Sequence, residues 1–164
     1  SDTRPVILVE YLYQIRNAGG GLYKFADLLE KYHRFQGGYI WDWQDKCLVA
    51  RTADGKAYYA YGGDFSESVT DWVNPTFMTC NGIVLPDLTP KPVAHEVRQV
   101  YCPVSFTSCL DLSHRHPLPV PGRYLVKNRH LVLDTRHYQA VYTLRENGHV
   151  VQTGPFDLPL LQAG

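Results

Sequence analysis

The clearest indication of the fold is the stretch Pro5-Val6-Ile7-Leu8-Val9-Glu10-Tyr11, in which an unbroken apolar run ends at a carboxylate. A short apolar run rich in β-branched residues predicts a strand covered on both faces, as in a parallel sheet with helices packed outside. A carboxylate at the C-terminal end of such a strand lies where α/β barrels build their active sites. Because an unpaired buried carboxylate is costly, we expect Glu10 to reach a cleft or to be paired. The alternative is a strand-end glutamate that points into water.

The following residues predict a strand–helix–strand unit. Apolar side chains recur at helical spacing over residues 22–32, with charged residues between them, and a second strand is expected over residues 37–43. Such a unit is normally parallel and right-handed. In the second strand Tyr39, Trp41 and Trp43 alternate with other residues, so they would share one face. That face is either a core aromatic cluster or an apolar wall for a ligand.

The rest of the chain predicts a hairpin, a helix and then a different class of fold. Asp54-Gly55 lies between two apolar runs and is a strong hairpin-turn signal. A helix is expected over residues 93–101. Beyond it, short strands are expected at 104–106, 124–126, 130–133 and 140–144, with a hairpin turn at Asn147-Gly148. This pattern is typical of a β-sandwich, and the domain boundary is expected near residue 102.

Composition excludes several classes of partner. The chain has 164 residues and a formal net charge of zero, which argues against nucleic acid or an anionic membrane as the main partner. No apolar run approaches the ~20 residues that a membrane span needs. The cysteines at positions 47, 80, 102 and 109 lack zinc-site spacing, and buried thiols are favoured over a disulfide framework.

Short segments spread over residues 4–92 carry a resemblance to a known family. In order they are Val9-Glu10-Tyr11, Asn17-Ala18-Gly19-Gly20-Gly21, Gln36-Gly37-Gly38-Tyr39-Ile40-Trp41-Asp42-Trp43, Tyr61-Gly62-Gly63-Asp64-Phe65, Cys80-Asn81-Gly82-Ile83-Val84 and Asp87-Leu88-Thr89-Pro90-Lys91-Pro92. Together they closely resemble the β-galactosidases of glycoside hydrolase family 2, and weaker similarity continues to the end of the chain. The resemblance implies an α/β plus all-β segment. Residues 1–102 would be the C-terminal part of a (β/α)8 TIM barrel, and residues 103–164 the start of an immunoglobulin-like β-sandwich.

The resemblance also implies roles for individual residues. Glu10 takes the position of the nucleophile in a retaining enzyme that hydrolyses terminal β-D-galactosides. Trp41 would form an apolar wall of the substrate site, since an indole face complements the C–H face of galactose. Asn81 would hold a sugar hydroxyl and, through its side-chain oxygen, a sodium ion, with the backbone carbonyl of Met78 as a further ligand. The rest of the sodium site and the magnesium ligands of the family would lie upstream of residue 1.

Two departures from the family pattern affect the expected substrate. Tyr13 stands where the family has a histidine that contacts the sugar, and Arg16 replaces a glycine. A phenol can still donate to a hydroxyl, but its reach and charge differ, and Arg16 could favour an anionic or larger sugar. A β-glucuronidase or another exo-glycosidase of family 2 therefore remains an alternative to a β-galactosidase.

A second carboxylate is missing from the pattern. Retaining glycosidases use two carboxylates about 5 Å apart, and in the family the acid/base follows an asparagine. This chain has no Asn-Glu dipeptide, and Asp42, Asp45 and Asp64 are weak substitutes. We therefore expect the segment to be inactive alone and to work with the remainder of the same enzyme chain. The complete enzyme is expected to be a homo-oligomer in the cytoplasm, with the periplasm as the alternative compartment. The alternative of another class is a non-catalytic carbohydrate-binding or assembly fragment.

Overall fold

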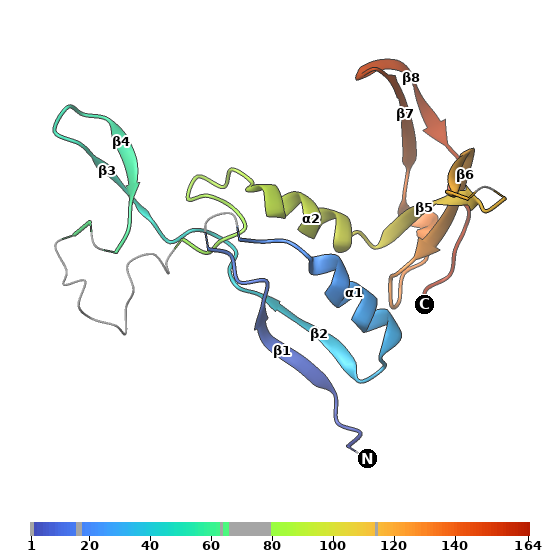
Figure 1. Ribbon diagram of the computed structural model, residues 1–164, viewed down its shortest axis with the longest axis horizontal. Helices are drawn as coiled ribbons and strands as arrows, with labels where there is room; N and C mark the ends of the chain where they lie inside the picture. The colour runs from blue at the N-terminus through green and yellow to red at the C-terminus, as the bar shows by residue number, and fades with distance from the viewer. Residues whose placement is uncertain (1, 16–17, 63, 66–79, 114) are drawn as a thin grey trace. The chain divides into compact units, whose positions relative to one another are not determined.

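The computed structural model describes residues 2–15, 18–62, 64–65, 80–113 and 115–164, which fall into two compact units, Ser1–Tyr101 and Cys102–Gly164 (Figure 1). The first unit contains the strands β1 (Val6–Tyr11), β2 (Phe35–Ile40), β3 (Leu48–Arg51) and β4 (Ala57–Ala60) and the helices α1 (Leu22–Lys31) and α2 (Pro92–Val100). The second unit contains β5 (Val104–Asp111), β6 (Leu118–Asn128), a short 3-10 helix (Thr135–His137), β7 (Ala140–Glu146) and β8 (His149–Phe156).

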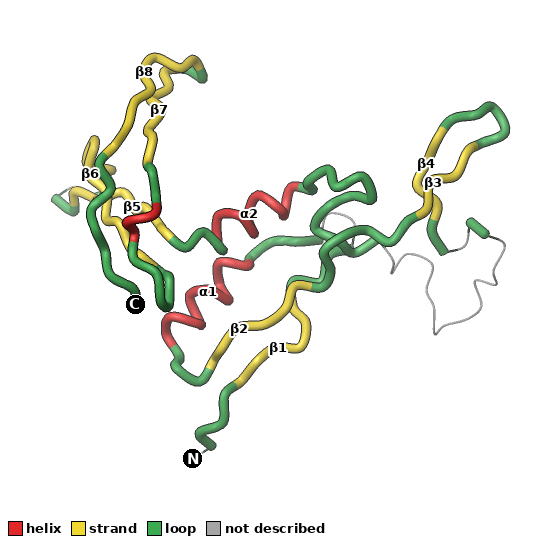
Figure 2. The backbone as a smooth tube through the Cα atoms, turned by 180° about the vertical axis from the view of Figure 1, so that it is seen from behind, coloured by secondary structure: helices red, strands yellow, loops and turns green. Residues whose placement is uncertain are grey.

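The predicted strand–helix–strand unit is confirmed. β1 and β2 pair in parallel, with α1 between them in the chain (Figure 2). α1 packs on the end of β1 through Phe25, whose ring meets that of Tyr11 edge-on at 4.9 Å between centroids. Gly38 permits the close approach of the two strands, because a Cβ there would lie 2.8 Å from the Cβ of Leu8.

β2 ends earlier than predicted, and the reason lies in its next partner. It stops at Ile40. Trp41 still bonds to the end of β1 and the residues after it, whereas residues 42–45 bond to segment 81–84, which runs parallel to them. Ile83 N donates to Trp43 O at 2.9 Å, and Asp45 N donates to Val84 O at 3.0 Å. β1, β2 with its extension, and segment 81–84 therefore lie in chain order and in parallel, as successive strands of an α/β barrel do. The part of the chain that the structure describes contains no closed barrel.

The apolar core of the first unit is small. Ile83, Val84 and Val93 form a buried cluster, against which Leu12, Ile40 and Val97 pack. The described residues do not cover the strand after Pro5 on both faces, since Val9 is 87% exposed. A core aromatic cluster is likewise absent among the described residues, because Tyr39, Trp41 and Trp43 are all exposed.

The hairpin predicted at Asp54-Gly55 is confirmed. β3 and β4 pair antiparallel, from Leu48 opposite Ala60 to Arg51 opposite Ala57. Gly55 has a φ of 85°, a left-handed conformation that glycine adopts without strain.

The second unit consists of two antiparallel hairpins, β5 with β6 and β7 with β8. The turn predicted at Asn147-Gly148 is confirmed between β7 and β8, where both residues have positive φ. The strand predicted at 130–133 is wrong. The Asn128 side chain donates to the backbone carbonyls of Leu133, Leu161 and Gln162 and holds this stretch as a loop. Phe106 of β5 and Phe156 of β8 meet at 6.0 Å between ring centroids.

Candidate functional site

Three chain segments meet where the parallel strands end. Trp41 N donates to Tyr11 O at 3.1 Å, Gln14 N donates to Trp41 O at 3.3 Å, and Asp42 N donates to Asn81 O at 2.9 Å. These backbone bonds join the residues after β1, the residues after β2 and segment 81–84 into one frame. Since side chains beyond the carboxyl ends of parallel strands share one edge of the sheet, this frame is the natural location of a site.

A buried ion pair stabilises this frame. Lys91 Nζ lies 2.6 Å from Asp45 Oδ1, and the two side chains are only 9% and 7% exposed. The same Asp45 oxygen accepts a hydrogen bond from Gly82 N at 2.7 Å. Gly82 must lack a side chain here, because a Cβ would lie 2.2 Å from the carbonyl carbon of Gln44. Asp45 therefore serves to hold segment 81–84 against the extension of β2.

A cluster of polar and aromatic side chains stands on the frame. We call Tyr13, Trp41, Asp42, Lys46 and Asn81 the Asn81 cluster. Asn81 is 2% exposed, and its Nδ2 donates to the Tyr13 hydroxyl at 3.1 Å. Its Oδ1 accepts a hydrogen bond from Lys46 Nζ at 3.1 Å. Each side-chain polar atom of this buried amide therefore has a partner.

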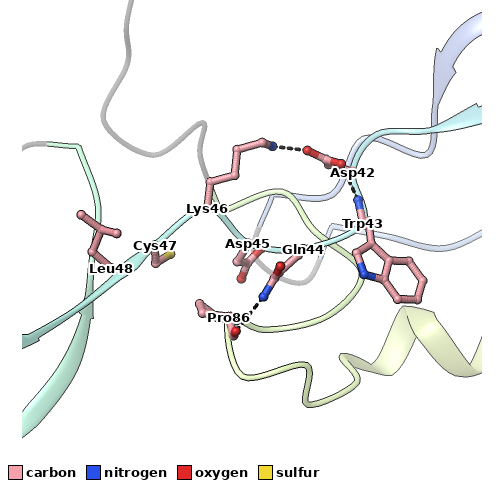
Figure 3. Close-up of a pocket in the computed structure, with 8 residues that line it drawn as sticks. All are labelled: Asp42, Trp43, Gln44, Asp45, Lys46, Cys47, Leu48 and Pro86. Atoms are coloured by element: carbon pink, nitrogen blue, oxygen red, sulfur yellow. Dashed lines mark hydrogen bonds and ion pairs between the residues drawn. The ribbon is translucent and has the colours of Figure 1, made fainter.

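Lys46 connects the remaining members of the Asn81 cluster. Its ammonium forms an ion pair with Asp42, toward which it points in Figure 3, and lies 5.5 Å from the centroid of the Trp41 ring. The hydrogen bond from Lys46 is the largest cause of a lowered pKa at Asp42, and the backbone N–H of Trp43 lowers it further. Asp42 is therefore an ionised partner of Lys46.

The structure brings together three of the predicted site residues. Tyr13, Trp41 and Asn81 all belong to the Asn81 cluster. Glu10 lies next to the last residue of β1, is exposed, and has no hydrogen-bond or ion-pair partner among the described residues. Met78 and Arg16 lie outside the residues that the structure describes.

The predicted sodium site can be tested against this geometry. A sodium ion would use the Asn81 Oδ1 as a ligand, but that oxygen already accepts a hydrogen bond from the Lys46 ammonium. An added cation beside this ammonium would be repelled. As the residues lie, a sodium ion would have to compete with the Lys46 ammonium for Asn81 Oδ1. In the described ranges, no group of three or more His, Cys, Asp or Glu side chains could hold another metal.

Two further groups near the site were not singled out from the sequence as functional. Lys46 had no signal beyond its spacing of four from Asp42. Gln14 is fully buried, and its Nε2 has no hydrogen-bond partner among the described residues. It fills the space over Gly19, where a Cβ would lie 1.5 Å from that nitrogen. The glycine run after β1 thus serves in part to admit the Gln14 side chain.

A pocket and a thiol pair adjoin the Asn81 cluster. The pocket has a volume of about 530 Å³ and is lined by residues 42–48 and Pro86 (Figure 3). Cys47 Sγ lies 3.0 Å from Cys80 Sγ, and both are free thiols. Burial, with the hydrogen bond to Cys80, raises the pKa of Cys47 to about 12.

None of the described helices is long and apolar enough to cross a membrane.

The chain is similar to proteins that are already known. The model of the family "Glycosyl hydrolases family 2, TIM barrel domain" matches residues 1–106. A protein named beta-galactosidase from Priestia megaterium is 38% identical over 149 residues, 91% of this chain and 13% of that protein. Proteins of the same name from Leuconostoc mesenteroides and Aeromonas hydrophila are each 36% identical, over 97% and 99% of this chain. The chain spans only 14% and 15% of their lengths.

Proposed function

Because the chain belongs to the TIM-barrel domain family of glycosyl hydrolases family 2, we propose that it is a segment of a retaining β-galactosidase and that Glu10 is the nucleophile. The relatives named beta-galactosidase support the reaction class. The observation that carries the proposal is the placement of Glu10. It lies at the carboxyl end of β1, and the Asn81 cluster is built on the segments that follow β1 and β2.

The proposed chemistry has two displacements. The Glu10 carboxylate attacks the anomeric carbon, and the bond from that carbon to the aglycone oxygen breaks with its electron pair on oxygen. An acid/base carboxylate, which we place outside this segment, protonates that oxygen and then deprotonates a water molecule. The water attacks the same carbon and releases Glu10 and the sugar. The exposed Glu10, without a partner among the described residues, is free to make the first attack.

We assign substrate contacts within the Asn81 cluster by hydrogen-bond capacity. The Tyr13 oxygen accepts from Asn81 Nδ2, which leaves its own O–H to donate to a sugar hydroxyl. Trp41 is 43% exposed, so part of its ring can face the apolar side of the sugar. Asn81 is only 2% exposed and donates to the Tyr13 hydroxyl, so we assign it the orientation of Tyr13 and assign the direct contact with the sugar to Tyr13.

The charge balance of the cluster favours a neutral sugar over a glucuronide. The positive charge of Lys46 is compensated by Asp42, so it offers no surplus charge to a sugar carboxylate. Arg16 lies outside the described residues. A β-galactoside is therefore the proposed substrate, and a β-glucuronide is the alternative that the assay below tests.

The proposed architecture follows from the uncovered apolar surface. We propose that residues 1–102 complete a TIM barrel with strands from the remainder of the enzyme chain, which would cover side chains such as Val9. We propose that residues 103–164, with their two antiparallel hairpins, belong to an immunoglobulin-like β-sandwich. The complete enzyme is proposed to be a homo-oligomer that binds magnesium through ligands outside this segment.

The test uses the full-length enzyme with Glu10→Gln, and Glu146→Gln as the control at an exposed glutamate of β7. Turnover of an aryl β-galactoside should fall by several orders of magnitude in Glu10→Gln and stay unchanged in the control. A 2-fluoro-galactoside should leave a hexosyl group on the Glu10 peptide of the wild-type enzyme, seen by mass spectrometry. Unchanged turnover in Glu10→Gln would remove the nucleophile role, and faster cleavage of an aryl β-glucuronide would favour the alternative substrate.

A further inference from the structure

The ammonium group of Lys46 lies where a cation would be needed to hold Asn81. Its Nζ is 3.1 Å from Asn81 Oδ1 and forms an ion pair with Asp42. One ammonium can donate to both oxygens at once. The same nitrogen stands 5.5 Å from the Trp41 ring centroid, within the range of a cation–π contact.

In this position the Lys46 ammonium makes the contacts that a bound cation would make. A hard monovalent cation prefers oxygen ligands, and the described oxygens around Lys46 Nζ are an amide oxygen and a carboxylate oxygen. About half of the Lys46 side chain is exposed, so its methylene stem can lie at the surface while its charged end reaches the cluster. The position that a sodium ion would take beside Asn81 is therefore filled by a charge that the chain itself carries.

We propose that the Lys46 ammonium replaces the sodium ion at Asn81, so that the enzyme binds its sugar without sodium at this position. Lys46 is then a positioning residue. It fixes the Asn81 amide, Asn81 fixes the Tyr13 hydroxyl, and the ammonium sits by the Trp41 ring. The role in sugar binding rests on the proposed glycosidase function, whereas the claim about the cation does not.

The experiment compares the full-length wild type, Lys46→Gln and Lys46→Arg in sodium chloride and in choline chloride at equal ionic strength. The matched control is Lys56→Gln. Lys56 lies in the turn between β3 and β4 and, like Lys46, forms an ion pair with an aspartate, Asp54. Sodium binding is followed by the line width of the sodium-23 NMR signal, which does not depend on activity. Sugar binding is followed by KM and kcat for an aryl β-galactoside.

For the wild type, Lys56→Gln and Lys46→Arg we expect no sodium-specific broadening at this site and the same KM in both salts. For Lys46→Gln we expect KM in choline chloride to rise by about tenfold, the loss of one charge-assisted hydrogen bond. The sodium-23 signal should then broaden and sodium should lower KM again, because the Asn81 oxygen has lost the Lys46 ammonium and sodium can take the place of that charge.

Three outcomes would overturn the proposal. The first is sodium-specific broadening in the wild type that does not increase in Lys46→Gln. The second is a KM of Lys46→Gln that equals the wild-type value in choline chloride. The third is a raised KM in Lys46→Gln that sodium does not lower. If Lys46→Gln fails to fold, a sodium requirement for KM in the soluble Lys46→Arg variant overturns the proposal, and its absence supports it. If the wild type shows no sodium-specific broadening and does not hydrolyse β-galactosides, the proposed function is refuted, whereas the claim about the cation is not.

Discussion

The buried pair of Asp45 and Lys91 offers the sharpest test of how the site is held. Asp45→Asn removes one charge from a pair whose nitrogen and oxygen lie 2.6 Å apart, with both side chains under 10% exposed. Breaking such a pair from one side leaves an uncompensated buried ammonium and costs about 3–5 kcal/mol. Because Asp45 Oδ1 also accepts from Gly82 N, the loss should fall on segment 81–84.

The assay is hydrogen exchange, read by mass spectrometry on the full-length enzyme. If local opening of segment 81–84 becomes easier by that amount, its amides should exchange faster by roughly two to four orders of magnitude. The double variant Asp45→Asn with Lys91→Met removes both charges, so its exchange should be slower than the sum of the two single effects predicts.

The matched control is the pair of Asp54 and Lys56, which is exposed and joined at 3.1 Å. Asp54→Asn should leave exchange in segment 81–84 unchanged, because an exposed ion pair contributes little. The reasoning is refuted if Asp45→Asn leaves the exchange of Gly82, Ile83 and Val84 at the wild-type rate, or if the two charge removals are additive.

The other predictions concern single groups of the site in the full-length enzyme. Tyr13→Phe should raise KM by about tenfold, since it removes the acceptor for Asn81 and the donor to the sugar; an unchanged KM would contradict that role. Iodoacetamide at pH 8 should label Cys47 much more slowly than Cys102, because the pKa of Cys47 is raised to about 12 and little of its thiolate is present. Equal rates would argue against the hydrogen-bonded, half-buried pair of Cys47 and Cys80. The pKa of Asp42 is lowered, so its pair with Lys46 is present above the ordinary aspartate pKa and is lost only as pH falls through the lower folded value. Loss of this pair should therefore not change KM between pH 8 and pH 5. A rise in KM that begins near pH 6 in the wild type and is absent in Asp42→Asn would contradict this.

Elements with a local cause could be predicted from the sequence. The helical spacing over residues 22–32 corresponds to α1, and Asp54-Gly55 lies in the turn between β3 and β4. The parallel pairing of β1 and β2 followed from the order of elements and the handedness rule. For α1 and the hairpin turn the deciding interactions join residues that are close in the chain, and the single connecting helix sets the direction in which β2 pairs with β1.

Features with a distant cause could not be predicted. Residues 42–45, beyond the end of β2 at Ile40, bond to segment 81–84, which lies far along the chain. The exposure of Val9 depends on which segments are present to cover it. Lys46 joins Asn81 across 35 positions of sequence, and nothing in its immediate neighbours marks that contact.

The lock between Asp45 and Lys91 also sets an order of events during synthesis of the protein. The two residues are 46 positions apart, and a ribosome adds about 5–20 residues per second, so Lys91 is made roughly 2–9 seconds after Asp45. In that interval Asp45 has no buried partner and must stay hydrated, because a lone buried charge is too costly. The nascent chain can therefore pair β1 with β2 early, but it can fasten the Asn81 side of the site only after the start of α2 has left the ribosome.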